Sequence, residues 1–164
     1  MNRICIALLA AASVICMCML PRTGADAAEL LPAQVLVIAR ENGQITVESD
    51  NGASGTGATL PDALDSMEKS AAGTLFLDTA EHIVLLQSAR ELLPAAARQE
   101  RFRPAAKLYL ARMEALDAEA CVTYLQAHPG RLTLAEARAA LLRAEEPEPA
   151  VLLPEKGGGM RHAE

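Results

Sequence analysis

The chain has 164 residues, a length typical of one domain, and 51% of them are aliphatic, aromatic, methionine or cysteine. Trp is absent and Tyr and Phe number two each, so alanine and leucine must supply most of the core. The net charge of −6 argues against nucleic acid and anionic lipid as main partners, because both repel an acidic surface.

A hydrophobic leader is expected at the N-terminus. Arg3 supplies a positive charge, residues 4–20 carry no charge, and residues 25–27 (Ala-Asp-Ala) place small side chains where a signal peptidase reads them. We therefore expect residues 1–27 to be a signal peptide and the domain to be exported, either extracellular or on the outer face of the cell membrane. An uncleaved leader is the alternative, because about 17 apolar residues approach the shortest length that spans a bilayer.

The cysteines do not predict a disulfide framework. Cys5, Cys16 and Cys18 lie inside the leader, and no small residue precedes Cys16 or Cys18 as lipid attachment requires. Cys121 is expected on the apolar face of a helix, where a buried, inert thiol is favoured over an intermolecular disulfide.

The first elements after the leader are two predicted strands, residues 33–39 and 45–48. Asn42-Gly43 lies between them, and this dipeptide is a strong hairpin signal because both turn residues need positive φ. A second turn signal, residues 50–52, ends the hairpin.

The remainder predicts helices alternating with strands at residues 74–77 with 83–86, and at 106–113. The predicted helix starts share a capping side chain, in three cases with an acidic residue three positions later. They are Thr59 with Asp62, Ser88 with Glu91, Asp117, and Thr133 with Glu136. Pro94 falls within the second helix, which therefore either begins near Leu93 or is kinked.

This order predicts a mixed α/β (α+β) fold: an N-terminal β-hairpin followed by α-β-α-β-α on a mixed sheet of about four strands. Crossover connections between the later strands require at least one parallel pair. Residues 28–144 are expected to form one domain. Residues 145–164 are rich in Pro, Glu and Gly and are expected to be disordered.

The glycine-rich segment 52–57 is the first candidate for chemistry. It lacks the G-x-G-x-x-G spacing and the following Lys of phosphate-binding loops, and Ser54 lacks the G-x-S-x-G frame of a nucleophile. We interpret the segment as a turn and helix entry.

The densest ionisable group is Asp78, Glu81 and His82. A carboxylate beside a histidine can orient a general base or bind a metal, but the only other histidines are His128 and His162. The group is therefore interpreted as solvated turn residues, and His82→Ala is expected to leave folding unchanged. We predict no catalytic, cofactor-binding or metal-binding residues, no cofactor and no enzymatic activity.

Several motifs resemble one family. Residues 55–64 (GTGATLPDAL) are similar to a G-x-T-x-x-E-A-L stretch that opens the first helix of the spore-germination receptor C subunits, the Ger(x)C family. The strand at 35–38 with its hairpin, the segment 91–94 (ELLP) and the strand at 107–111 follow in the family's order. The resemblance covers residues 29–128, the N-terminal domain only.

This resemblance implies an exported, membrane-associated, non-enzymatic subunit of a nutrient-sensing receptor, whose partners are the other membrane receptor subunits. Two alternatives stay open. The first is a free-standing secreted module that binds a ligand or a protein. The second is a hydrolase or metal enzyme that uses Asp78, Glu81 and His82.

Overall fold

The computed structural model describes residues 30–154 and 160–163. The leader predicted at 1–27, its three cysteines and the tail glycines 157–159 lie outside the described residues. Across the described ranges, no helix is both long enough and apolar enough to cross a membrane.

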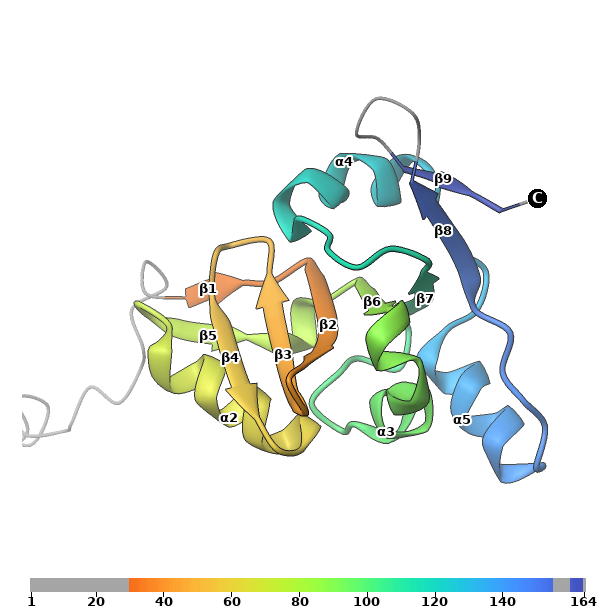
Figure 1. Ribbon diagram of the computed structural model, residues 1–164, viewed down its shortest axis with the longest axis horizontal. Helices are drawn as coiled ribbons and strands as arrows, with labels where there is room; N and C mark the ends of the chain where they lie inside the picture. The colour runs from red at the N-terminus through yellow and green to blue at the C-terminus, as the bar shows by residue number, and fades with distance from the viewer. Residues whose placement is uncertain (1–29, 155–159, 164) are drawn as a thin grey trace, which may run out of the picture.

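The described elements form a mixed α/β fold (Figure 1). The strands are β1 (Leu30–Pro32), β2 (Val35–Glu41), β3 (Gln44–Ser49), β4 (Ser54–Gly57), β5 (Thr74–Phe76), β6 (His82–Leu86), β7 (Lys107–Ala111), β8 (Ala150–Pro154) and β9 (Met160–His162). The helices are α2 (Leu60–Ser70), α3 (Leu93–Arg98), α4 (Ala118–Ala127) and α5 (Leu134–Leu142), with short 3₁₀ helices η2 (Leu77–Thr79) and η3 (Gln87–Leu92).

The main sheet has the strand order β4-β3-β2-β6-β7-β8-β9. Strands β2, β6, β7 and β8 run parallel, and the antiparallel strands lie at the two ends of the sheet. All five residues of β6 are buried, as expected for a continuous aliphatic strand covered on both faces. The predicted parallel pairing is thus confirmed and extends over four strands.

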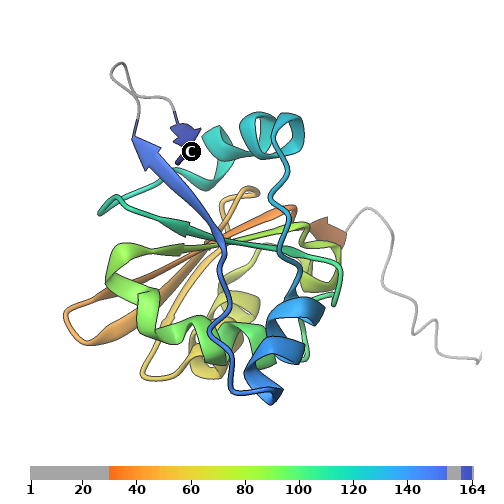
Figure 2. The same ribbon diagram turned by 90° about the vertical axis from the view of Figure 1, so that its right-hand side faces the viewer.

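Helices cover both faces of this sheet (Figure 2). Alternate residues of each central strand point to opposite faces, so one face packs on α2, α3 and α5 while the other packs on α4. Leu36, Ile83 and Leu108 belong to the first core, and Val37 and Val84 belong to the second.

Local signals placed the hairpin and three of the helix starts correctly. Asn42 and Gly43 both have positive φ (50° and 81°), which is the turn that the sequence predicts. The Thr59 hydroxyl accepts from the Asp62 N–H and caps α2. The two other confirmed caps are Asp117 on α4 and the Thr133–Glu136 capping box on α5.

The capping box predicted at Ser88 and Glu91 is wrong. Both residues lie inside η3, and each has a partner on β2 instead: the Ser88 hydroxyl accepts from the Arg40 N–H at 3.1 Å, and the Glu91 carboxylate pairs with the Arg40 guanidinium at 3.0 Å. The α-helix begins at Leu93, which places Pro94 in its first turn, where a missing N–H is tolerated. Pro94 therefore lies in the first turn of α3 and does not kink the helix.

The prediction of about four strands is too low, since seven strands form the main sheet of the described residues. The largest difference lies in the segment 145–164, predicted to be disordered: β8 pairs with β7 in parallel, and β9 pairs with β8. Leu152 of β8 is fully buried in the α4-side core, and this burial explains why a Pro- and Glu-rich segment is ordered there.

The strand predicted at 74–77 does not continue into the main sheet. Its counterpart β5 pairs only with β1, in a separate two-stranded parallel sheet, and η2 separates it from β6. The chain therefore uses two separate strands where the aliphatic pattern indicated one interrupted strand.

The glycine-rich segment predicted as a turn and helix entry contains an edge strand, β4, directly against α2. A Cβ atom added at Gly55 would lie 2.2 Å from the Met67 nitrogen, and one added at Gly57 would lie 2.4 Å from the Ala63 nitrogen. Only hydrogen fits at these two positions, because the neighbouring atoms belong to the helix backbone.

Helix α5 ends in a Schellman arrangement with alanine at the position that favours glycine. The Ala144 N–H donates to the Leu141 carbonyl, the Glu145 N–H donates to the Ala140 carbonyl, and Ala144 has φ 59°. We expect Ala144→Gly to stabilise the protein by about 1 kcal/mol, because a left-handed conformation penalises a Cβ atom. Urea unfolding followed by circular dichroism measures this; an unchanged or lower midpoint would contradict it.

Candidate functional site

The structure separates the three ionisable residues that the sequence groups together. Asp78 in η2 and Glu81 before β6 are exposed, and the Glu81 carboxylate lies 3.4 Å from the Arg103 guanidinium. His82 is buried, with 4% of its surface exposed, so its assignment to a solvated turn is wrong. As the first residue of β6, it points to the α4 face of the sheet.

His82 belongs to a buried hydrogen-bond chain. Its Nδ1 lies 2.9 Å from the hydroxyl oxygen of Tyr109, and that oxygen accepts from the Gly130 N–H at 2.8 Å. Because the hydroxyl already accepts from Gly130, its own proton is best donated to His82 Nδ1, which leaves the imidazole proton on Nε2. These hydrogen bonds connect strand β6, strand β7 and the segment that follows α4.

Both tyrosines and all three histidines of the protein gather here, in a histidine–tyrosine cluster of His82, Tyr109, Tyr124, His128 and His162. The Tyr124 ring stacks on His128, with centroids 4.7 Å apart, and on His162 at 5.7 Å. The His162 Nε2 lies 3.0 Å from the His128 carbonyl oxygen and holds β9 against the end of α4.

This cluster cannot be predicted from the sequence, because its members lie on four elements and one of them, His162, falls in the segment expected to be disordered. Its one local signal is that Tyr109 stands between Leu108 and Leu110 on a predicted strand. In the described part of the chain, no three His, Cys, Asp or Glu side chains gather as a metal ion requires.

The environment of His82 predicts a pH dependence of stability. Burial lowers the pKa of His82, Glu81 opposes this shift and Lys107 adds to it. Below the ordinary histidine pKa of about 6.5, the folded state therefore binds fewer protons than the unfolded state. The contribution of His82 to the free energy of unfolding should be fully present above that pH and should decrease as the pH falls below it.

Urea midpoints between pH 8 and pH 5 measure this dependence. The variant His82→Gln should lose most of the decline below pH 6.5, whereas His128→Gln should keep it. An equal decline in wild type and His82→Gln would assign the effect to other groups.

Cys121 is buried, as predicted, and within residues 30–154 and 160–163 it forms no disulfide. Burial, together with the nearby Asp117, raises its pKa to about 12, and its Sγ lies 2.8 Å from the Asp117 carbonyl oxygen. A thiol that stays protonated is a poor nucleophile, so Cys121 contributes to the core and not to a reactive site.

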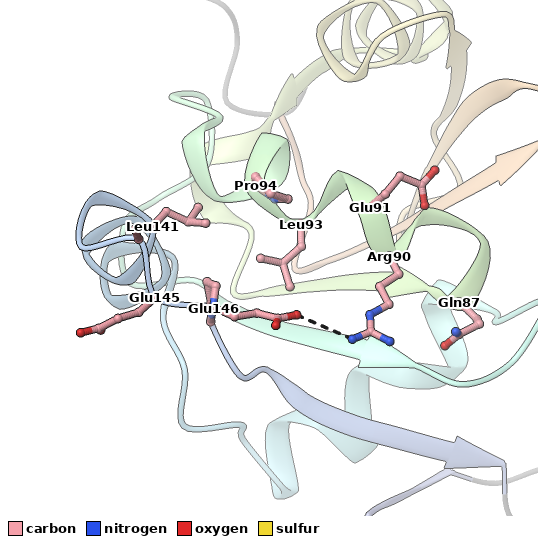
Figure 3. Close-up of a pocket in the computed structure, with 10 residues that line it drawn as sticks. Gln87, Arg90, Glu91, Leu93, Pro94, Leu141, Glu145 and Glu146 are labelled. Carbon is pink, nitrogen blue, oxygen red and sulfur yellow. Dashed lines mark ion pairs between the residues drawn. The ribbon is translucent and has the colours of Figure 1, made fainter.

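A groove that could hold a ligand or a partner lies next to η3, at the carboxyl end of β6 (Figure 3). We call it the η3–α5 groove. It has a volume of about 710 Å³ and is lined by Gln87, Arg90, Glu91, Leu93, Pro94, Leu141, Ala144, Glu145, Glu146 and Pro147. Grooves at the carboxyl ends of parallel strands are frequent binding sites in α/β folds.

The groove joins an apolar part to a charged rim. Leu93 and Pro94 come from α3 and Leu141 comes from α5, and the two helices are also held together by the Arg138 guanidinium, which donates to the Gln99 carbonyl at 2.8 Å. On the rim, Arg90 and Glu146 form an ion pair at 3.7 Å, visible in Figure 3.

The chain was compared with known proteins. No family model matches it, no curated protein matches it, and no solved structure does either.

Proposed function

We propose that this chain is a non-enzymatic, exported interaction domain that acts as an accessory subunit of a membrane receptor, in the manner of the N-terminal domain of germinant-receptor C subunits. The leader, cleaved or retained, would place it outside the cytoplasm. Its partners would be the membrane subunits of such a receptor.

The observation that carries the proposal is the packing of the segment on which the resemblance depends. Residues 55–64 form β4, the Thr59 cap and the first turns of α2, and both Gly55 and Gly57 touch the helix backbone. This packing explains why the segment needs glycine at both positions and supports the strand–helix unit that the resemblance implies.

The buried polar groups His82 and Tyr109 already bond to each other and so offer no free reactive group. The hydroxyl of Tyr109 is bonded to both His82 and Gly130, and burial raises the pKa of Tyr109 while it lowers that of His82. Both groups are therefore neutral at pH 7 and are occupied with each other, which suits a structural role.

The test uses the full chain with an affinity tag, produced in a spore-forming Gram-positive host. We expect it in the spore membrane fraction, copurifying with the multi-spanning receptor subunit after detergent extraction. In the organism that carries the gene, its deletion should slow germination triggered by nutrients. A soluble product that starts at Ala28, appears in the medium and captures no receptor subunit would favour the secreted-module alternative.

A further inference from the structure

Strand β5 has a free edge. It pairs on one side with β1 (Figure 1), and among the described residues no strand pairs with its other side. The Ala33 N–H donates to the Phe76 carbonyl, so the backbone groups of Phe76 face β1. Successive residues of a strand direct these groups to opposite edges, and the N–H and C=O of Leu75 therefore point away from β1. Neither group of Leu75 has a hydrogen-bond partner among residues 30–154 and 160–163.

A groove lies beside this free edge, and we call it the β5 groove. It has a volume of about 430 Å³ and is lined by Glu68, Leu75, Phe76, Leu77, Asp78, Glu100 and Arg101. No residue of β1 lines it, so it lies on the side of β5 to which the backbone groups of Leu75 point. A strand edge with unpaired backbone groups is a template for another strand, and the groove gives that strand a place to lie.

The β5 groove has a negative charge that is only partly compensated. The one cationic side chain that lines it, Arg101, pairs with Glu68 at 3.5 Å and also with Asp65 outside the groove. Asp78 and Glu100 are exposed, and within the described residues neither carboxylate forms an ion pair or a side-chain hydrogen bond. These two carboxylates favour a basic partner and disfavour a second copy of this acidic chain.

An exposed aromatic ring adds an apolar contact to the β5 groove. Phe76 is 44% exposed, and Leu142 on α5 is the only other large hydrophobic side chain of the described residues classed as exposed. Phe76 stands two residues before Asp78 and lines the same groove. The aliphatic stem of a Lys or Arg can pack on such a ring while its cation reaches a carboxylate.

We infer that β5 accepts a short basic segment of a partner protein as a third strand of the β1–β5 sheet. The inference rests on the proposed function as an interaction domain and names the partner segment by its chemistry. The segment lies extended in the β5 groove, where its backbone bonds to the N–H and C=O of Leu75. Its Lys or Arg side chains pair with Asp78 and Glu100.

The probe is a short fluorescein-labelled peptide in which Lys alternates with Thr and Val. One control peptide carries Glu for Lys, and a second keeps Lys but has methylated backbone nitrogens, which removes its N–H donors. We expect the Lys peptide to bind the full chain in fluorescence anisotropy, with an affinity that falls at higher salt, and neither control to bind. Hydrogen exchange followed by NMR should show that the Leu75 amide becomes protected in the complex. A Lys peptide that does not bind would overturn the inference.

Matched variants locate the site. Asp78→Lys and Glu100→Lys should each weaken binding of the Lys peptide roughly tenfold, and Phe76→Ser several-fold. These side chains are exposed, so circular dichroism should report an unchanged fold. Glu114→Lys, the same charge change on the exposed segment between β7 and α4, should leave the affinity unchanged. Equal losses for Asp78→Lys and Glu114→Lys would overturn the inference, as would binding of the methylated peptide or a Leu75 amide that stays unprotected.

The two proposals fail separately, because different measurements test them. Receptor subunits that copurify equally with wild type and Asp78→Lys would remove the role of the β5 groove and keep the proposed function. Peptide binding at β5 without any copurifying receptor subunit would keep the groove and remove the proposed function.

Discussion

Gly55→Ala is expected to destabilise the fold by about 3 kcal/mol or more, and Gly57→Ala by a similar amount. At Gly55 the new methyl group would lie 2.3 Å from the Ala63 carbonyl oxygen as well as against the Met67 nitrogen. Backbone atoms cannot turn away as side chains do, so α2 must move off β4. Urea unfolding followed by circular dichroism is the appropriate measurement, because the chain lacks Trp as a fluorescent probe.

The control for this prediction is Gly43→Ala. Gly43 has a left-handed backbone, with φ 81°, and a Cβ atom there meets nothing within 4 Å. Its cost should be the conformational penalty alone, about 1 kcal/mol. If Gly55→Ala cost no more than this control, the direct contact between β4 and α2 would be refuted.

The second large effect is expected from Tyr109→Phe, which should cost about 3 kcal/mol. The substitution preserves the ring and removes only the hydroxyl, which leaves His82 Nδ1 and the Gly130 N–H buried without their partner. Each unsatisfied buried group costs about 1–3 kcal/mol, so the loss should be large for so small a change.

Tyr124→Phe is the matched control. Within residues 30–154 and 160–163 the Tyr124 hydroxyl makes no recorded hydrogen bond, and its removal should cost well under 1 kcal/mol. His82→Ala, expected from the sequence to be neutral, should instead destabilise, since it removes a buried side chain bonded to Tyr109. If Tyr109→Phe lowered the free energy of unfolding no more than Tyr124→Phe does, the buried hydrogen bonds from His82 through Tyr109 to Gly130 would be refuted.

The parts of the fold that the sequence predicts are those set by local chemistry. Asn42-Gly43 specifies its turn, and Thr59, Asp117 and Thr133 each bond to backbone groups within three residues. These signals need no information about distant segments. The capping prediction at Ser88 failed because a residue far away in the chain, Arg40, bonds to the same side chain.

The elements that escaped prediction depend on distant contacts. Strand β4 has glycine at two of its four positions because the close approach of α2 requires it there, and glycine is depleted in strands. Strand β8 has the aliphatic run 151–153, but Pro and Glu around it indicated disorder, and its burial depends on β7 and α4. The same dependence hid the histidine–tyrosine cluster, since His82 and His162 stand 80 positions apart.

The place of β8 in the parallel sheet also bears on when the protein can fold. Tyr109 pairs with Ala150, so the last parallel strand arrives some 40 residues after its neighbour. A chain threaded unfolded through a membrane from its N-terminus would thus keep β7 without its outer partner until residues 150–154 had emerged. In any folding that proceeds from the N-terminus, the pairing of β8 with β7 is therefore a late step, and it is the step that covers the outer edge of β7.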